Sequence, residues 1–401
     1  MLMLATKYLP ILAVSLLSLS TSLQAVTVSE KAKKIAQETI IVDSHIDVPY
    51  RMHKKWVDVT KATDGGDFDY PRAKTGGLNA PFMSIYIPAT YEGEGKDFGV
   101  QLAHQLIDSV EAIAYRAGDK FAVAYSTDDV YAQFKQGKIS LPMGMENGSP
   151  IANSFDNLAM FYKRGIRYVT LSHSLSNHIS DSSYDLRRQW KGLSEFGKKL
   201  IPEMNKIGMM IDISHVSDDA FYQALELTKA PVIASHSSLR KFTPGFERNM
   251  DDEMIKALAK NGGVIQINFG SSFVSAAPRE WQDTLKAKYE AENTKRGEEK
   301  AKRIEKLYKD NNPYPFASLD TVLDHIDHVK NLVGIDYIGI GSDYDGVGDS
   351  LPRDLKDVSY YPQLVQGLIN RGYSEKDIKK ILSGNFMRVW KKVEQLAQSQ
   401  K

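Results

Sequence analysis

The stretch Met209-Met-Ile-Asp-Ile-Ser-His-Val-Ser-Asp218 carries the signals that decide the fold. It opens on a mostly apolar run over 209–213, which is typical of a strand buried on both faces. Ser217 is a favourable N-cap for an amphipathic segment, so we expect a helix over Asp218–Thr228. A second strand-like run follows over Val232–Ser235. A strand, a helix and a second strand in this order indicate a parallel sheet.

The same pattern recurs along the chain. We expect eight strands, at Thr39–Val42, Phe82–Pro88, Ile139–Met143, Tyr168–Leu171, Met209–Ile213, Val232–Ser235, Val264–Asn268 and Tyr337–Gly341. The expected helices are Ser154–Arg164, Ser194–Lys206, Asp218–Thr228, Met250–Lys260, Leu319–Leu332 and Ser374–Ser383, with Ser194, Ser217 and Ser374 as N-caps. Eight such units favour an α/β fold of the (β/α)8 TIM-barrel type. An open doubly wound sheet is the alternative, although no phosphate-binding glycine motif follows a strand.

Composition excludes several classes of protein. The chain has 401 residues, a formal net charge of +1 and no cysteine. That length suits one large domain with insertions or two ordinary ones. The balanced charge gives no argument for a nucleic-acid partner. Without cysteine there is no disulfide, thiolate ligand or cysteine nucleophile, so any metal site must use His, Asp and Glu.

Residues 1–25 form a candidate targeting segment. A short apolar run follows Lys7 and ends in small and polar residues up to Ala25, as in a cleaved signal peptide. An uncleaved membrane anchor is the alternative, although the run is short for a span. We therefore expect residues 26–401 to be an exported, periplasmic or secreted bacterial protein of one barrel domain, with no membrane anchor after cleavage. The charge-dense stretch around 272–315 is expected to be a helical insertion on the surface.

Ionisable residues lie at or near the ends of six of the expected strands. They are the His45–Asp47 pair, Glu146, His173, His215, His236 and Asp343. In a barrel the carboxyl ends of all strands meet at one mouth, where active sites lie. Scattered structural histidines would have no reason to prefer these positions. The pattern therefore predicts a site at the mouth.

Five of these residues could hold two metal ions. His45 and Asp47 alternate on one strand and point the same way. His215 and His236 come from adjacent strands, and the Glu146 carboxylate can bridge two ions. Such a set is typical of a binuclear hydrolytic site and suits Zn²⁺, with Mn²⁺ or Co²⁺ as substitutes. For each histidine alone, a hydrogen-bonded core or surface position is the alternative.

The other histidines have no such placement. His53 lies in a loop and His104 on a helical stretch. His178 is close to His173 in the sequence and could lie either at the expected site or away from it. His325 and His328 are three residues apart on a charged helix, which favours a solvated helix face over a metal site.

At these positions the sequence resembles the membrane dipeptidase (renal dipeptidase) family of the metal-dependent amidohydrolases. The resemblance runs in order through nearly the whole mature chain. The matching stretches are 43–50 (DSHIDVPY), 144–147 (GMEN), 170–173 (TLSH), 211–218 (IDISHVSD), 231–238 (PVIASHSS), 248–250 (RNM), 339–346 (GIGSDYDG) and 384–390 (GNFMRVW). The family implies a (β/α)8 barrel with two zinc ions and hydrolysis of dipeptides.

The resemblance also implies individual roles. It makes His45 and Asp47 ligands of one zinc, His215 and His236 ligands of the other, and Glu146 the bridge. It makes His173 and Arg248 contacts to the substrate and Asp343 the catalytic carboxylate, which moves the proton from the attacking water to the leaving amine. Other amidohydrolases bridge their metals with a carbamylated lysine on strand four, and the stretch 168–173 has no lysine.

Without the resemblance, the residues alone allow other roles for single side chains and other functions for the protein. Arg248 alone would be expected in a surface ion pair with Asp251 or Asp252, and Asp345 in a supporting position in the loop after strand eight. The reaction could concern another amide, such as a cyclic amide, a β-lactam or an N-acyl amino acid. An exported binding protein with structural metals is a third hypothesis. The expected partner is a dipeptide, with a homodimer possible; the disulfide link and lipid anchor of animal members have no counterpart here.

Overall fold

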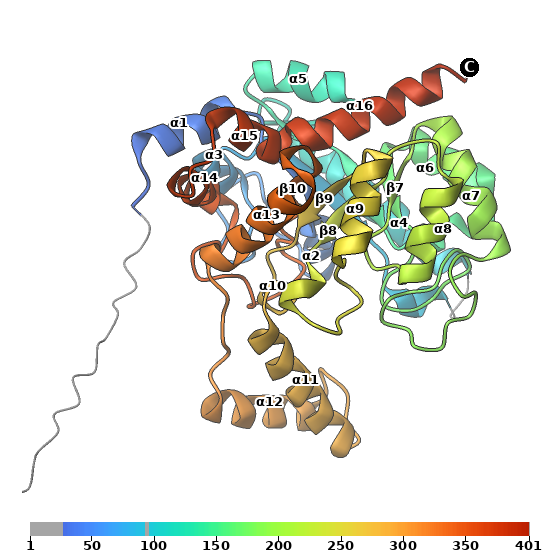
Figure 1. The fold of residues 1–401 in the computed structure, drawn as a ribbon, viewed down its shortest axis with the longest axis vertical. Coiled ribbons are helices and arrows are strands. Elements are labelled where there is room, and N and C mark those ends of the chain that lie inside the picture. The colour runs from blue at the N-terminus through green and yellow to red at the C-terminus, as the bar shows by residue number, and fades with distance from the viewer. Residues whose placement is uncertain (1–26, 93–95, 401) are drawn as a thin grey trace, which may run out of the picture.

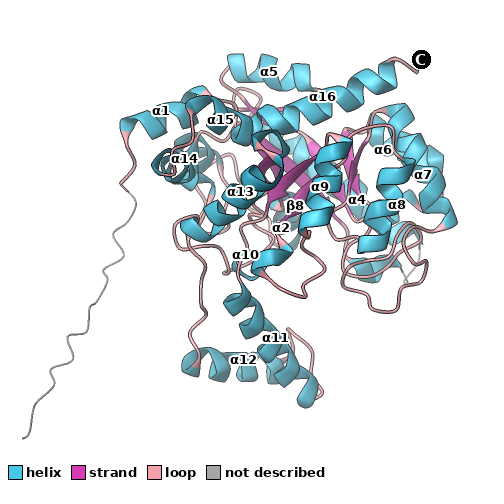
Figure 2. Cartoon of the chain, viewed as in Figure 1, coloured by secondary structure: helices cyan, strands magenta, loops and turns pink. Residues whose placement is uncertain are grey.

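Eight parallel strands form the centre of the molecule. The computed structural model describes residues 27–92 and 96–400, and the order of the strands in the sheet is β1-β2-β5-β6-β7-β8-β9-β10. Their bounds are β1 Val42–Ile46, β2 Ala80–Tyr86, β5 Met143–Glu146, β6 Ile166–Thr170, β7 Met210–Asp212, β8 Ile233–Ser237, β9 Val264–Ile267 and β10 Ile338–Ile340. The sheet closes where Ile46 bridges Tyr344 and the Asp47 N–H donates to the Tyr344 carbonyl at 2.8 Å. The (β/α)8 barrel is thereby confirmed (Figure 2).

Helices surround this barrel (Figure 1). In chain order they are α1 Glu30–Glu38, α2 Val48–Lys54, α3 Tyr70–Gly76, α4 Lys96–Arg116, α5 Thr127–Lys135, α6 Phe155–Lys163, α7 Glu195–Ile207, α8 Asp218–Leu227, α9 Asp252–Asn261, α10 Ser271–Val274, α11 Ala276–Ala291, α12 Glu299–Asn311, α13 Leu319–Val333, α14 Tyr361–Asn370, α15 Glu375–Lys379 and α16 Asn385–Gln398. The three predicted N-caps are confirmed, since Ser194, Ser217 and Ser374 accept hydrogen bonds from the backbone N–H groups three residues on. Among the described helices, none is both long and apolar enough to cross a membrane. The segment 1–25 lies outside the described residues.

One predicted strand is wrong in its extent. The run 139–143 is two strands: β4 (Ile139–Leu141) pairs with β3 (Phe121–Val123) in a separate small sheet, and β5 starts at Met143. Pro142 separates them because it has no N–H for a ladder, while its carbonyl accepts the Met83 N–H at 2.8 Å. The barrel strand is therefore the one that ends on Glu146.

Two other boundaries also differ. Strand one covers Val42–Ile46 and not Thr39–Val42, because Thr39 is still hydrogen-bonded to the end of α1. His45 therefore belongs to the strand itself. The helix predicted at 374–383 is α15 followed by a π-helical turn over Lys380–Gly384 that leads into α16.

The C-terminal helix closes the end of the barrel opposite the mouth. Phe386 and Trp390 of α16 are buried, and their rings lie 5.0 and 5.1 Å from that of Phe82 on β2. Phe82 in turn stacks on Tyr168 of β6, with ring centroids 5.5 Å apart. Gly144 leaves room for the Tyr168 ring, since a Cβ there would lie 1.9 Å from it. A packed aromatic column thus runs from α16 to the middle of the barrel.

Helices α11 and α12 form an arm that projects from the barrel (Figure 1). The arm contains the charged stretch singled out at 272–315, and its charges pair within helices, as in Arg279 with Asp283 and Lys306 with Asp310. It has a small apolar cluster of its own, made by Trp281, Leu285, Tyr289 and Ala301. The arm starts directly after β9 and α10, so its base lies beside the mouth.

Candidate metal and active site

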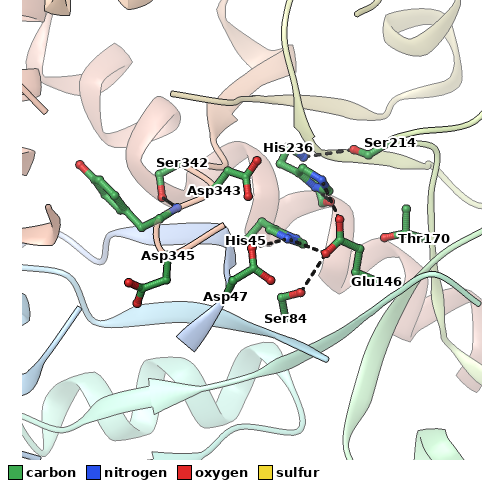
Figure 3. Close-up of polar contacts among 12 residues, drawn as sticks. His45, Asp47, Ser84, Glu146, Thr170, Ser214, His236, Ser342, Asp343 and Asp345 are labelled. Carbon is green, nitrogen blue, oxygen red and sulfur yellow. Dashed lines mark hydrogen bonds and ion pairs between the residues drawn. The ribbon is translucent and has the colours of Figure 1, made fainter. Parts of the chain in front are cut away.

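The strand ends bring the predicted residues together. His45 lies on β1 with Asp47 just beyond it, Glu146 ends β5, His215 follows β7, and His236 lies on β8. All five are buried. Figure 3 shows the Glu146 carboxylate beside the imidazoles of His45 and His236, with a dashed contact to each.

The two oxygens of Glu146 face different ligands. Oε2 lies 3.3 Å from His45 Nε2, which is itself 3.5 Å from Asp47 Oδ2. Oε1 lies 3.2 Å from His215 Nε2 and 3.3 Å from His236 Nε2. The Glu146 carboxylate thus lies between two groups of nitrogen and oxygen donors.

Hydrogen bonds fix the tautomer of two imidazoles. The Tyr168 hydroxyl donates to the Ser44 carbonyl at 3.0 Å, so it can only accept from His45 Nδ1, 2.9 Å away. On β8, the Ser235 hydroxyl donates to Asp212 at 2.6 Å and so accepts from His236 Nδ1 at 2.7 Å. In both rings Nδ1 carries the proton and Nε2 turns toward the cluster. Metal-binding histidines are held in this way.

Burial and charge set the protonation of the cluster. Burial lowers the pKa of His215 and of His236 well below the ordinary value, with Arg248 and neighbouring imidazoles adding to it. Burial would also lower the pKa of His45, but Tyr168, Glu146 and Asp47 raise it well above its usual range. Burial would raise the pKa of Glu146, yet His45 and His173 hold it well below. An ionised Glu146 beside the neutral imidazoles of His215 and His236 is the arrangement that favours a bound cation.

These residues fit a metal centre. The N–O separations of 3.2–3.3 Å around Glu146 are close to the roughly 3.3–3.4 Å between ligands of a tetrahedral zinc ion. His215 and His236 bring their Nε2 atoms to 2.8 Å, and His45 Nε2 is buried without a hydrogen-bond partner among the described residues. Three groups of possible ligands lie within reach of one ion each: His45, Glu146 and His236; Glu146, His173 and His215; and His45, Asp47 and Asp343.

His173 lies at the outer edge of the cluster. It follows β6, and its Nε2 is 3.2 Å from Glu146 Oε1. The ring packs against Tyr86, the last residue of β2, at 4.9 Å edge to face. Burial, with Glu146 and Asp47, raises the pKa of Tyr86, which stays a neutral phenol. Tyr86 was not predicted from the sequence, although its place at the end of a strand was a usable signal.

Arg248 is buried beside the cluster, and the expectation of a surface ion pair is wrong. It donates to Ser237 Oγ at 2.8 Å and to the His236 carbonyl at 2.7 Å. Asp251 lies instead 3.6 Å from Arg240, and Asp252 lies 2.8 Å from His328. Arg248 Nε has no hydrogen-bond partner among the described residues. Part of its planar fork is therefore free to bind an anion.

Asp343 completes the mouth. Its Oδ2 accepts from Asn268 Nδ2 at 2.7 Å, and the Asn268 Oδ1 accepts the Gly270 N–H at 2.7 Å, which fixes the amide's orientation. Gly346 folds over the site, since a Cβ there would lie 2.2 Å from both Asp343 Oδ1 and Asp47 Oδ2. Burial and the nearby Asp47 raise the pKa of Asp343 to about 7. Asn268, just beyond β9, is a second residue whose place in the site was not predicted from the sequence.

Asp345 points away from the cluster in Figure 3. Its Oδ1 accepts from Arg51 at 3.0 Å and from the Asp67 N–H at 2.7 Å. Strand β10 ends at Ile340, and both Asp343 and Asp345 have a left-handed backbone, with φ of 64° and 66°. Asp345 therefore holds the loop in place, as predicted.

The remaining histidines lie elsewhere. His53 stacks on Tyr50, His104 contacts Arg164, and His178 packs against Phe196. The solvated helix face predicted for His325 is wrong: its side chain is buried between α13, α10 and the β8–α9 loop. There Nδ1 accepts the Leu239 N–H at 3.2 Å and Nε2 contacts the Val274 carbonyl at 3.0 Å.

Comparison with known proteins agrees with this geometry. The family model described as membrane dipeptidase (peptidase family M19) matches residues 29–401. The chain is 34% identical to Dipeptidase tcpJ of Claviceps purpurea over 343 residues, which covers 84% of this chain and 71% of that protein. It is 30% identical to Dipeptidase 3 of Mus musculus over 376 residues, covering 92% and 67% of the two.

A solved structure shares the fold. The crystal structure of the probable dipeptidase PvdM from Pseudomonas aeruginosa superposes with a TM-score of 0.79 at 26% identity. The match covers 92% of this chain and 98% of that one. The barrel, the cluster of possible metal ligands at its mouth and the match over 29–401 lead to one conclusion. The chain belongs to the membrane dipeptidase family, peptidase family M19, and is a metallo-dipeptidase.

Proposed function

We propose that this enzyme holds two zinc ions and uses them to hydrolyse the peptide bond of dipeptides with free termini. The observation that carries the proposal is the Glu146 carboxylate, each of whose oxygens faces a different set of ligands. His45 and Asp47 would hold one ion, His215 and His236 the other, and Glu146 both. Mn²⁺ or Co²⁺ suit the same nitrogen and oxygen donors. Ions held by these residues would lower the pKa of a bound water to about 7 and would so supply hydroxide at neutral pH.

Asp343 is assigned the proton transfer. Its carboxylate is buried at the mouth, and the pKa of about 7 lets it take a proton at neutral pH and release it again. Asn268 occupies Oδ2 as a donor, so the proton belongs on Oδ1. That oxygen lies toward Asp47 under Gly346. Asp343 would therefore accept a proton from the attacking water and pass it to the leaving amine.

Two further residues would hold the substrate. His173, at the outer edge of the cluster, can donate to the oxyanion that forms from the scissile carbonyl. Arg248 offers the free part of its fork to the terminal carboxylate. Its bonds to Ser237 and the His236 carbonyl keep the guanidinium at a fixed place relative to the ligands. A dipeptide would thus lie with its second residue at Arg248 and its peptide bond over Glu146.

Metal analysis combined with kinetics tests the proposal. The zinc-loaded protein should contain close to two equivalents, and a chelator should abolish dipeptide cleavage. Glu146→Gln should lose metal and activity, whereas the matched surface variant Glu195→Gln should keep both. Asp343→Asn should keep both metals but lose roughly 10²–10⁴-fold in kcat. If the native protein binds only one equivalent of zinc, and Glu146→Gln binds the same amount, then Glu146 does not bridge two ions.

Amidated substrates test the role of Arg248. The native enzyme should cleave a dipeptide with an amidated C-terminus more slowly than the same dipeptide with a free carboxylate. In Arg248→Lys the two rates should lie closer together, because lysine lacks the bidentate fork that binds the carboxylate. Equal cleavage of the free and amidated forms by the native enzyme would overturn this assignment. Cyclic amides, β-lactams and N-acyl amino acids in the same panel test the other amide substrates.

We also propose that the protein is exported, to the periplasm or the medium. The support is the short apolar segment within residues 1–25 and a chain without cysteine. N-terminal sequencing of protein from the native host should start near residue 26. Recovery of chains that still begin at Met1 from the cytoplasm would contradict export.

A further inference from the structure

Three aromatic side chains line the mouth on one side of the proposed substrate position. Tyr184 comes from the β6–α7 loop, Phe246 from the β8–α9 loop and Phe273 from α10. The Phe246 ring lies 5.8 Å from Tyr184, edge to face, and 5.9 Å from Phe273. We call these three residues the aromatic wall. All three are partly exposed, Tyr184 at 36%.

The aromatic wall borders both the metal ligands and Arg248. Tyr184 lies 5.9 Å from the ring of His215, and the guanidinium carbon of Arg248 lies 5.5 Å from the centre of Phe273. Arg248 itself is almost fully buried, so a carboxylate bound to its fork would lie against the wall. The α-carbon next to that carboxylate would then direct its side chain along the three rings.

The projecting arm supports the wall from outside. Arg279, on the first turn of α11, lies with its guanidinium carbon 4.0 Å from the centre of the Phe246 ring. Asp283, one turn further along, accepts from Arg279 Nε at 2.9 Å and from its NH2 group at 2.6 Å. The pair neutralises the Arg279 charge and fixes its plane against Phe246. The arm thus has a contact with the mouth that a purely surface insertion would lack.

We propose that the aromatic wall is the subsite for the side chain of the second residue, and that it makes dipeptides with an apolar second residue the preferred substrates. The inference rests on the proposed function, because Arg248 must bind the terminal carboxylate of the dipeptide. Three rings in contact with a leucine, methionine or phenylalanine side chain remove apolar surface from water. A glycine in the same place leaves the wall hydrated. A lysine would lose hydration of its ammonium group there, since two acids near the wall are already paired: Asp283 with Arg279, and Glu247, next to Phe246, with Arg188.

A series of dipeptides with glycine first and a varied second residue tests the proposal. We expect kcat/KM for Gly-Leu, Gly-Met and Gly-Phe to exceed that for Gly-Gly by about 10-fold or more, the scale of a few methylene contacts in an apolar pocket. The lysine side chain is similar in length to that of methionine, but kcat/KM for Gly-Lys should be lower than kcat/KM for Gly-Met. The decisive quantity is the ratio of kcat/KM for Gly-Leu to that for Gly-Gly.

Substitutions in the aromatic wall test whether the wall causes the preference for Gly-Leu over Gly-Gly. Phe246→Ala should reduce the Gly-Leu to Gly-Gly ratio several-fold, Phe246→Leu should retain part of it, and Arg279→Ala should reduce it less than Phe246→Ala does. Tyr115→Ala is the control, since Tyr115 is an aromatic residue 92% exposed on α4. If Phe246→Ala does not fold, as circular dichroism would show, Arg279→Ala decides, and a Gly-Leu to Gly-Gly ratio unchanged from that of the native enzyme would then count against the subsite.

The outcomes separate the two proposals. If no dipeptide is cleaved, the proposed function fails. If dipeptides are cleaved but Gly-Leu and Gly-Gly differ by less than about twofold, the function stands and the subsite is wrong. A folded Phe246→Ala enzyme with an unchanged ratio would also overturn the subsite, because the preference would then arise elsewhere.

Discussion

At the scale of single residues, the site depends on side chains that touch the proposed ligands from behind. His45 and His236 turn Nε2 toward Glu146 because Tyr168 and Ser235 accept from their Nδ1 atoms. Asp343 turns one oxygen toward the cluster because Asn268 holds the other. These supporting contacts are as open to experiment as the ligands themselves.

Replacing Tyr168 by phenylalanine should weaken metal binding. The ring would still pack on Phe82, but His45 would lose the acceptor that fixes its tautomer. Loss of such a contact typically costs about 10–100-fold in metal affinity. Competition with a chromophoric chelator measures the change in Kd. Tyr289→Phe, which removes a hydroxyl that bonds Glu305 in the arm, should leave Kd as it was.

Replacing Asn268 by alanine should alter the pH dependence of catalysis. The Asn268 hydrogen bond lowers the pKa of Asp343 against the effect of burial, so its loss raises that pKa. Because Asp343 would act in its ionised form in the proposed proton transfer, the ascending limb of the kcat profile should move to higher pH. In an Asp343→Asn background the same substitution should have little further effect. A shift of the limb in that background would mean that Asn268 acts on another group.

At the scale of secondary-structure elements, the order of the strands and helices was easier to predict from the sequence than the residues at which each one begins and ends. The eight-strand barrel was predictable because buried parallel strands are nearly continuous apolar runs. The split at Pro142 was missed, since β4 and β5 are both apolar and lie almost end to end. His325 was misplaced because its neighbours on α13 are acidic, while its own side faces α10. Tyr86 and Asn268 were missed because neither titrates near neutral pH.

His325 should make stability depend on pH. Burial lowers its pKa to about 4, below the usual 6.5, so the unfolded chain binds a proton that the folded protein rejects. Stability contributed by the neutral ring is present above the unfolded pKa and is lost as pH falls from about 6.5 toward 4. Between pH 7 and pH 5 we expect a loss of about 2 kcal/mol from this group.

Urea unfolding at the two pH values measures that loss. In His325→Asn the difference between pH 7 and pH 5 should be smaller by about the same amount. His53→Asn, at a histidine in an exposed position, serves as the control. An unchanged pH dependence in His325→Asn would assign the acid sensitivity to other groups.

At the scale of the whole molecule, the site joins elements from every part of the chain. Ligand candidates come from β1, β5, β8 and the segments after β6 and β7, and each lies at the same end of the barrel. An ion bound at the mouth would therefore hold together strands that are far apart in the sequence. Removal of the metal should loosen the barrel as a whole.

Chelation should lower the thermal stability of the protein. A ligand that binds only the folded state at 100 times its Kd contributes about 2.7 kcal/mol per site. Scanning calorimetry of the zinc-loaded and chelated protein should show a fall in Tm, restored by added zinc. In Glu146→Gln the difference between the two samples should shrink. An identical Tm with and without chelator would place the metal outside the folded core of the site.

The aromatic column under the site has a consequence for biosynthesis. All eight strands are synthesised before α16, the helix whose Phe386 and Trp390 seal the lower end of the barrel. Without those residues, the ring of Phe82, on which Tyr168 stacks, would lose its contacts at the lower end of the barrel. The lower end of the barrel can therefore pack only after α16 has been synthesised. Such late packing would be compatible with the export proposed above, because a chain without α16 has not yet closed its barrel.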